Sequence, residues 1–197
     1  GCARAAADLL RRIGPHSLAW ERADGAARCP GVSDRDRVRL ALGAGTALLE
    51  DGRTELAEQR LEEGRAGAHV LGDAGLEAAA LQALAMIEHE RGLPERVSAR
   101  LGAAQALLSG RSDSAALLAR IRSTAAAAAI HQGRRQEARG LCEQAVAWFR
   151  ESGDIVHLGR ATLNLAVLLG QDGDLEASGA RYLEALQWMR ESGDRYG

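Results

Sequence analysis

Arginine side chains at a regular spacing are the residues of this sequence best suited to binding chemistry. Arg39, Ala79, Arg120 and Arg160 stand in one column, each about 40 residues after the one before. A guanidinium group donates paired hydrogen bonds that match a carboxylate or a phosphate. If the column lies on one surface, it predicts a positive stripe that binds such groups. The alternative is a solvated helix surface with local Glu or Asp partners, because all 25 basic residues of the chain are arginines.

Residues that usually perform catalysis do not form a recognisable group. The histidines occur singly and never as HExxH, which argues against a zinc site of that kind. They are His16, His69, His89, His131 and His157. Acidic pairs fall at expected turns or exposed helix surfaces, where solvation and helix-end charge explain them. The absence of lysine excludes Schiff-base chemistry and a phosphate-loop lysine. We therefore expect no enzyme activity, no catalytic residue, no metal and no cofactor.

Cysteine content, hydropathy and net charge indicate the cellular compartment and the classes of partner that the protein is expected to have. Cys2, Cys29 and Cys142 are odd in number and have no CxxC spacing, so we expect reduced thiols in a cytoplasmic protein. No apolar run is long enough to cross a bilayer. A net charge of −2 gives no general attraction to nucleic acid or acidic membranes. Direct nucleic-acid binding and membrane binding are not expected.

Two ladders, one of aspartate and one of glycine, reveal an internal repeat. The aspartates are Asp34, Asp73, Asp113, Asp154 and Asp194, which again lie about 40 residues apart. The glycines are Gly52, Gly92, Gly133 and Gly173, each at the same distance before the next aspartate, with Gly14 as a looser fifth member. Apolar residues between the ladders follow helical spacing, so each repeat is expected to hold two helices. The glycine should end the first helix in the left-handed conformation, and the aspartate should cap, or nearly cap, the next repeat's first helix.

Small and large residues recur at fixed positions relative to each ladder glycine, as closely packed helices require. The small columns are Gly45, Ala85, Ala126 and Ala166, and Gly64, Ala104, Ala145 and Ala185. The larger columns are Leu61, Leu101, Cys142 and Tyr182, and Ala68, Leu108, Phe149 and Met189. The pattern predicts that these positions lie in the core, with neighbouring repeats covering one another.

These columns resemble the tetratricopeptide repeat, most closely in the stretch from Leu163 to Ala177. The usual closing proline is missing, and Gly-Asp closes a repeat of about 40 residues in place of the usual 34 or so. Longer repeats of this kind resemble those of large bacterial regulators, including maltose-regulator-like and LuxR-type activators. The resemblance implies an all-α fold, an α-solenoid of stacked antiparallel helical hairpins in a right-handed superhelix. The expected parts of this one solenoid domain are 1–34, an atypical first hairpin, the repeats 35–73, 74–113, 114–154 and 155–194, and 195–197, the start of a next helix.

In tetratricopeptide arrays the first helix of each hairpin lines the concave face, so the resemblance places a binding face there. Asn164 matches a position at which peptide-binding members hold a ligand's backbone or terminal carboxylate. The expected partner-binding residues are Arg39, Gln82, Met86, His89, Arg120, Ser123, His131, Arg160, Asn164 and Gln171.

The resemblance and the absence of catalytic groups lead to a binding function. We expect a non-catalytic scaffold or sensor segment of a larger bacterial transcriptional regulator, which binds a protein, a peptide or a small effector. The alternatives are a self-association or autoinhibitory module and a free-standing adaptor. A homo-oligomer and an intramolecular contact with further domains are left open. The missing initiator methionine and the helix-like opening Arg195-Tyr196-Gly197 suggest a segment of a longer protein.

Overall fold

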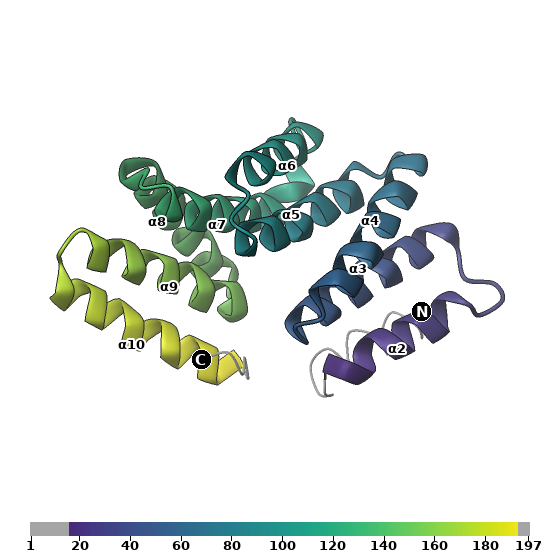
Figure 1. Cartoon of the computed structure of the whole chain (residues 1–197), viewed down its shortest axis with the longest axis horizontal. Helices are drawn as coiled ribbons and strands as arrows, with labels where there is room; N and C mark the ends of the chain where they lie inside the picture. The colour runs from purple at the N-terminus through teal and green to yellow at the C-terminus, as the bar shows by residue number, and fades with distance from the viewer. Residues whose placement is uncertain (1–15, 193–197) are drawn as a thin grey trace. The chain divides into compact units, whose positions relative to one another are not determined.

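The computed structural model describes residues 16–192, apart from the side chains of residues 16–19, 24 and 112, and this part of the chain is helical without a strand (Figure 1). The helices are α2 (His16–Ala27), α3 (Asp34–Glu50), α4 (Thr54–Val70), α5 (Ala74–Glu90), α6 (Pro94–Leu107), α7 (Ala115–His131), α8 (Arg135–Ser152), α9 (Ile155–Gln171) and α10 (Leu175–Ser192), with a short 3-10 turn η1 (Ser112–Ser114) before α7. The predicted all-α class is confirmed. The predictions for Gly14, Asp194 and 195–197 lie outside the described residues, as does half of the expected first hairpin.

The chain forms two compact units, divided between Ser109 and Gly110. In the first unit each helix from α2 to α6 packs on the next, and α3 also packs on α5. In the second unit the same holds from α7 to α10, and α7 also packs on α9. Contact between alternate helices arises when hairpins stack, because the first helix of one hairpin then touches the first helix of the next. Each unit is therefore built in the manner of an α-solenoid.

The glycine ladder ends the first helix of each hairpin, as predicted. Gly52, Gly92, Gly133 and Gly173 all have a positive φ, between +67° and +87°. After α3, the N–H of Gly52 donates to the carbonyl of Leu49, and the N–H of Arg53 donates to that of Leu48. Paired bonds of this kind satisfy the last carbonyl groups of a helix and turn the chain back on itself. Pro94 opens α6 at the first turn, where its missing N–H costs nothing.

The aspartate ladder marks the starts of the following hairpins. Asp73 and Asp154 are the N-caps of α5 and α9, and each accepts a backbone N–H at 3.2 Å, from Leu76 and His157. Asp34 and Asp113 lie one residue away from the cap positions of α3 and α7, which are Ser33 and Ser114. The expectation of a cap or near-cap is confirmed for all four described aspartates.

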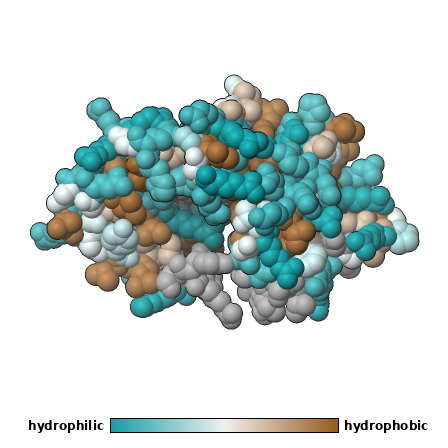
Figure 2. Space-filling model, in the orientation of Figure 1, coloured by the Kyte–Doolittle hydropathy of each residue, from teal (hydrophilic) through white to brown (hydrophobic). Residues whose placement is uncertain are grey.

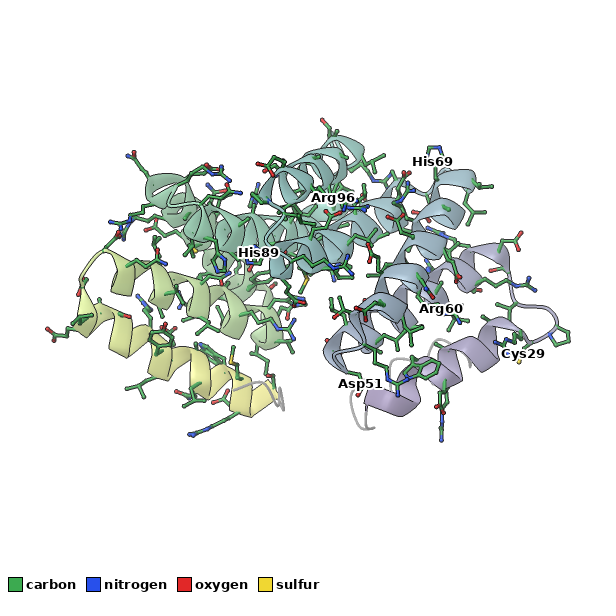
Figure 3. The ribbon with its side chains drawn as sticks, viewed as in Figure 1. Cys29, Asp51, Arg60, His69, His89 and Arg96 are labelled. Atoms are coloured by element: carbon green, nitrogen blue, oxygen red, sulfur yellow. The ribbon has the colours of Figure 1, made fainter. Side chains whose placement is uncertain are left out.

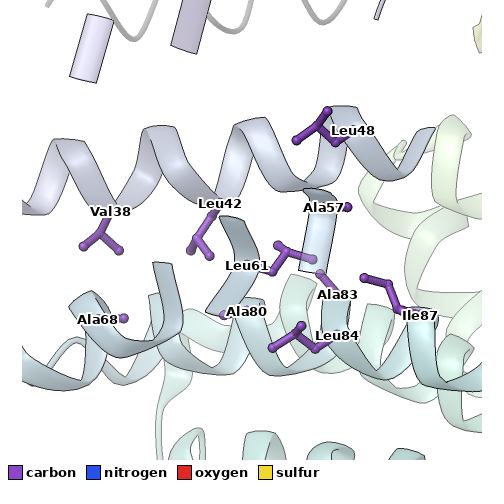
Figure 4. Packing of buried hydrophobic residues seen from close by; sticks show 10 residues of the cluster. All are labelled: Val38, Leu42, Leu48, Ala57, Leu61, Ala68, Ala80, Ala83, Leu84 and Ile87. Carbon is purple, nitrogen blue, oxygen red and sulfur yellow. The ribbon is translucent and has the colours of Figure 1, made fainter. Parts of the chain in front are cut away.

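The core of the first unit shows why apolar residues recur at fixed positions in each repeat. Leu61 of α4 lies in a buried cluster with Val38 and Leu42 of α3 and with Leu84 and Ile87 of α5 (Figure 4). The second helix of one hairpin is therefore covered on two sides, by its own partner and by the first helix of the next hairpin. This double coverage is what one hairpin cannot achieve alone.

All but one of the predicted core-column residues are buried. The exception is Tyr182, whose column mates Leu61, Leu101 and Cys142 are at most 5% exposed, whereas Tyr182 is 44% exposed. The expectation for Tyr182 was therefore wrong. The physical reason is that Tyr182 lacks the cover that α5 gives Leu61 and that α9 gives Cys142, because α10 packs on α9 among the described helices.

Candidate functional site

Two arginines of the predicted column lie near one imidazole in the second unit. Arg120 stands on α7 and Arg160 on α9, and both are half-buried. Burial lowers the pKa of His157, and the positive charges of Arg120 and Arg160 lower it further. Because α7 packs directly on α9, residues one repeat apart are brought to one surface. We call this surface, made of Arg120, Ser123, His157, Arg160 and Asn164, the α7–α9 face.

His157 is held in place by three contacts at the start of α9. Its Nδ1 lies 2.8 Å from Oδ2 of Asp154, and its backbone N–H donates to Oδ1 of the same carboxylate. Its ring stacks on buried Phe149 of α8, with centroids 5.3 Å apart and an interplanar angle of 23°. Because a carboxylate oxygen accepts, Nδ1–H is the donor to Asp154, and the lowered pKa of His157 favours the neutral form of the ring. The imidazole is therefore fixed between the carboxylate of Asp154 and the ring of Phe149, within electrostatic reach of two guanidinium groups.

Asn164 links the two helices of this face. Its Nδ2 donates to the backbone carbonyl of Ser123 at 3.2 Å, a bond between residues 41 positions apart. The bond fixes the orientation of the amide and leaves its carbonyl oxygen as a second polar group at the half-buried surface. The position selected by the tetratricopeptide resemblance thus lies on the same pair of helices as the two arginines.

Two further candidates stand at the helix ends. His131 is the last residue of α7 and Gln171 the last of α9, and both are exposed. Each precedes its ladder glycine by two residues, so they share a column. They lie at the ends of α7 and α9 next to the turns.

The four candidate residues of the first unit are Arg39, Gln82, Met86 and His89. The contacts of Arg39 and Gln82 described below lie within their own helices. Arg39 of α3 pairs with Asp36 one turn earlier, at 3.4 Å, as the solvated-surface alternative predicts. Gln82 of α5 is buried, and its amide donates to the sulfur of Met86 at 3.2 Å. Met86 and His89 are half-buried on the same helix, and Figure 3 labels His89 there. Arg39 thus stands on α3 and the other three candidates on α5.

The sequence did not reveal an ionic network in the first unit. Arg100 of α6 donates to Glu88 of α5 at 2.8 Å and to Glu62 of α4 at 2.9 Å, and Arg96, labelled in Figure 3, also pairs with Glu88. The Glu88 side chain is only 2% exposed. Burial alone would raise the pKa of Glu62, but hydrogen bonds from Arg65 and Arg100 outweigh it and lower that pKa. The network connects three helices of two hairpins. No short sequence spacing predicts it, because Glu88 and Arg100 meet across a turn and Glu62 comes from the hairpin before.

Two classes of site are missing from residues 16–192. Among the side chains that the structure describes, no three His, Cys, Asp or Glu residues are grouped so that they could hold a metal ion. No helix in the same range is long and apolar enough to cross a membrane.

Comparison with known proteins supports the fold and goes no further. The structure resembles the crystal structure of BtubC (BKLC) from P. vanneervenii, with a TM-score of 0.68 and 17% sequence identity over 99% of this chain and 81% of that one. At this identity the likeness concerns the helical repeat architecture alone. No protein-family model and no curated protein matches the sequence.

Proposed function

We propose that this chain is a non-catalytic, tetratricopeptide-like binding segment of a larger bacterial transcriptional regulator, and that its α7–α9 face holds an acidic group of a protein, peptide or effector. One observation carries the proposal: Arg120 and Arg160, from two hairpins, both act on the imidazole of His157. Two guanidinium groups at one half-buried surface favour an acidic group, because the guanidinium geometry matches that of a carboxylate.

The roles of the polar residues follow from their positions. Arg120 and Arg160 supply charge and direct hydrogen bonds to the acidic group. Asn164, oriented by Ser123, offers its amide oxygen to a ligand N–H, as a peptide backbone would provide. The binding surface spans two stacked helices, so occupancy favours the packed arrangement of α7 against α9. That coupling is the route by which a sensor segment would report binding to further domains.

The test uses a six-residue acidic peptide with a free terminal carboxylate and its amidated, asparagine-substituted analogue. Isothermal titration at low salt should show binding of the acidic peptide alone. Replacing either Arg120 or Arg160 with alanine should weaken binding about 10-fold or more, because a charge-assisted hydrogen bond contributes about 1.5–3 kcal/mol. Arg135→Ala is the matched control, since it removes the same charge from an exposed position on α8. Equal affinity of all three variants would place the two arginines on ordinary solvated surface.

A further inference from the structure

The N-cap of α9 is held by a titratable side chain, whereas the N-cap of α5 is held by a permanent cation. Asp73, the N-cap of α5, accepts from Nε of Arg35 on α3 at 2.8 Å. In the second unit α7 has Ala116 where α3 has Arg35. The ring of His157 meets Asp154 instead, with Nδ1 2.8 Å from Oδ2. Between pH 5 and 8 the partner of Asp154 can change its charge, and the partner of Asp73 cannot.

The register of α7 against α9 brings both arginines of the α7–α9 face to this end of α9. Asn164 donates to the carbonyl of Ser123 across the two helices at 3.2 Å. Arg160 and Arg120 each stand about one turn earlier, four residues before Asn164 and three before Ser123. Arg160 also follows His157 by three residues, a spacing at which side chains of one helix are neighbours. The imidazole therefore lies within electrostatic reach of both guanidinium groups.

The charged groups that act on the imidazole come from its own helix and from α7. They are Asp154 and Arg160 of α9 and Arg120 of α7. The other helices that pack on α9 meet this end of it with uncharged side chains, which are Phe149 of α8 at the ring and Trp188 and Met189 of α10 at Gly159. One carboxylate and two guanidinium groups together carry one positive charge. Protonation of the ring raises that charge to two, and an acidic ligand offsets the increase.

The surroundings of His157 disfavour its charged form but leave it open to solvent. Its side chain is 32% exposed and stacks on buried Phe149. Val156 beside it is 38% exposed, and Figure 2 shows hydrophobic and hydrophilic side chains side by side where Figure 1 shows α9. Burial and the two arginines lower the pKa of His157, although the bond to Asp154 acts in the opposite direction. A further negative charge at this face would make protonation of the ring more favourable.

We propose that the α7–α9 face binds its acidic ligand together with a proton, which His157 takes up. The inference rests on the proposed function of that face and adds its regulation, because the ligand is then bound more tightly as the pH falls from 8 to 6. The proton comes from the solvent and goes to Nε2, since Nδ1 already carries the hydrogen that is donated to Asp154. Occupancy of the face therefore depends on pH as well as on ligand concentration.

Isothermal titration with the six-residue acidic peptide measures the proton uptake directly. At pH 6, titrations in MES and in bis-Tris should give different binding enthalpies, because the buffer supplies the proton and the two buffers differ in ionisation enthalpy. The affinity should be about 3- to 10-fold higher at pH 6 than at pH 8, since a nearby negative charge raises the pKa of an imidazole by about one unit. The carboxylates of the peptide, with a usual pKa of about 4, stay ionised over this range.

Three variants assign the proton to its site. His157→Gln should bind the peptide without proton uptake and with equal affinity at pH 6 and pH 8, because glutamine does not titrate. Asp154→Asn keeps a good N-cap and removes the negative charge beside Nδ1, so the uptake should move to lower pH. His69→Gln on α4 is the matched control, since it removes a histidine that is 74% exposed in the first unit, and it should leave the uptake unchanged.

The outcomes separate this inference from the proposed function. Peptide binding that requires Arg120 and Arg160 but brings no proton uptake at pH 6, with equal affinity at pH 6 and pH 8, overturns the inference and leaves the proposed function in place. Undiminished uptake by His157→Gln also overturns it, because the proton then goes to another group. The absence of peptide binding at both pH values contradicts the inference and the proposed function together.

Discussion

Replacement of one glycine in α3 tests the close packing of the first unit. A Cβ added at Gly45 would lie 2.6 Å from Cγ of Leu61 and 3.2 Å from the backbone oxygen of Ala57. Leu61 is 1% exposed and Ala57 is a fixed part of α4, so neither can move aside without cost. Overpacking of this kind costs about 1–3 kcal/mol, while alanine gains about 1 kcal/mol over glycine in helix propensity. We expect Gly45→Ala to destabilise the protein by up to about 2 kcal/mol.

Gly43→Ala in the same helix is the matched control. A Cβ at Gly43 would meet nothing within 4 Å, so only the gain in helix propensity remains. We expect stabilisation of about 0.5–1 kcal/mol. The other hairpins have alanine in the Gly45 column, so the comparison measures the closeness of α3 and α4 in particular.

Guanidinium denaturation followed by circular dichroism measures both variants, with ΔG taken from the linear extrapolation. The double variant Gly45→Ala with Leu61→Ala should lose less than the sum of the two single losses, because the smaller side chain makes room for the added Cβ. The packing argument is refuted if Gly45→Ala and Gly43→Ala shift the free energy of unfolding in the same direction by the same amount.

Three further predictions concern charged and titratable groups. Arg100→Met should destabilise the first unit by about 3 kcal/mol in urea denaturation, because the buried carboxylate of Glu88 loses its closest cation; an unchanged midpoint would contradict the network. The pKa of His157 lies below its usual 6.5, so the unfolded chain takes up the proton more readily and stability falls as the pH drops through 6.5. His157→Gln should reduce that loss between pH 7 and 5, and an identical pH profile would argue against it. Burial raises the pKa of Cys142 to about 11, so mass spectrometry at pH 8 should find iodoacetamide on exposed Cys29 far sooner than on Cys142.

The repeat could be predicted from sequence because turns impose strict local requirements. A left-handed residue after a first helix is nearly always glycine, and an N-cap favours a short polar side chain, so Gly133 and Asp154 mark their positions without knowledge of the fold. Alanine columns such as Ala85 and Ala126 record close helix packing in the same way. Local geometry that recurs in every hairpin can therefore be predicted from a single sequence.

The α7–α9 face could be predicted only in part, because it depends on which side chains of different hairpins come together. The Arg120 and Arg160 column lies on two helices that do pack on one another, but nothing in the sequence placed His157 between a carboxylate, an aromatic ring and two guanidinium groups. The spacing Asp154-x-x-His157 was the available signal, since it puts a histidine in the first turn beside its own N-cap. The exposure of Tyr182 could not be predicted from the column either, because a column gives a position within the repeat and not the side chains that cover that position.

The most direct test of the proposed function is a map of where an acidic ligand binds. In two-dimensional NMR spectra of the labelled chain, the six-residue acidic peptide should shift the backbone amide of Ser123, the side-chain amide of Asn164 and the imidazole signals of His157. Binding should also raise the pKa of His157, because the added negative charge offsets Arg120 and Arg160. Saturable shifts confined to other helices, with the pKa of His157 unchanged, would contradict the assignment of the α7–α9 face as the binding site.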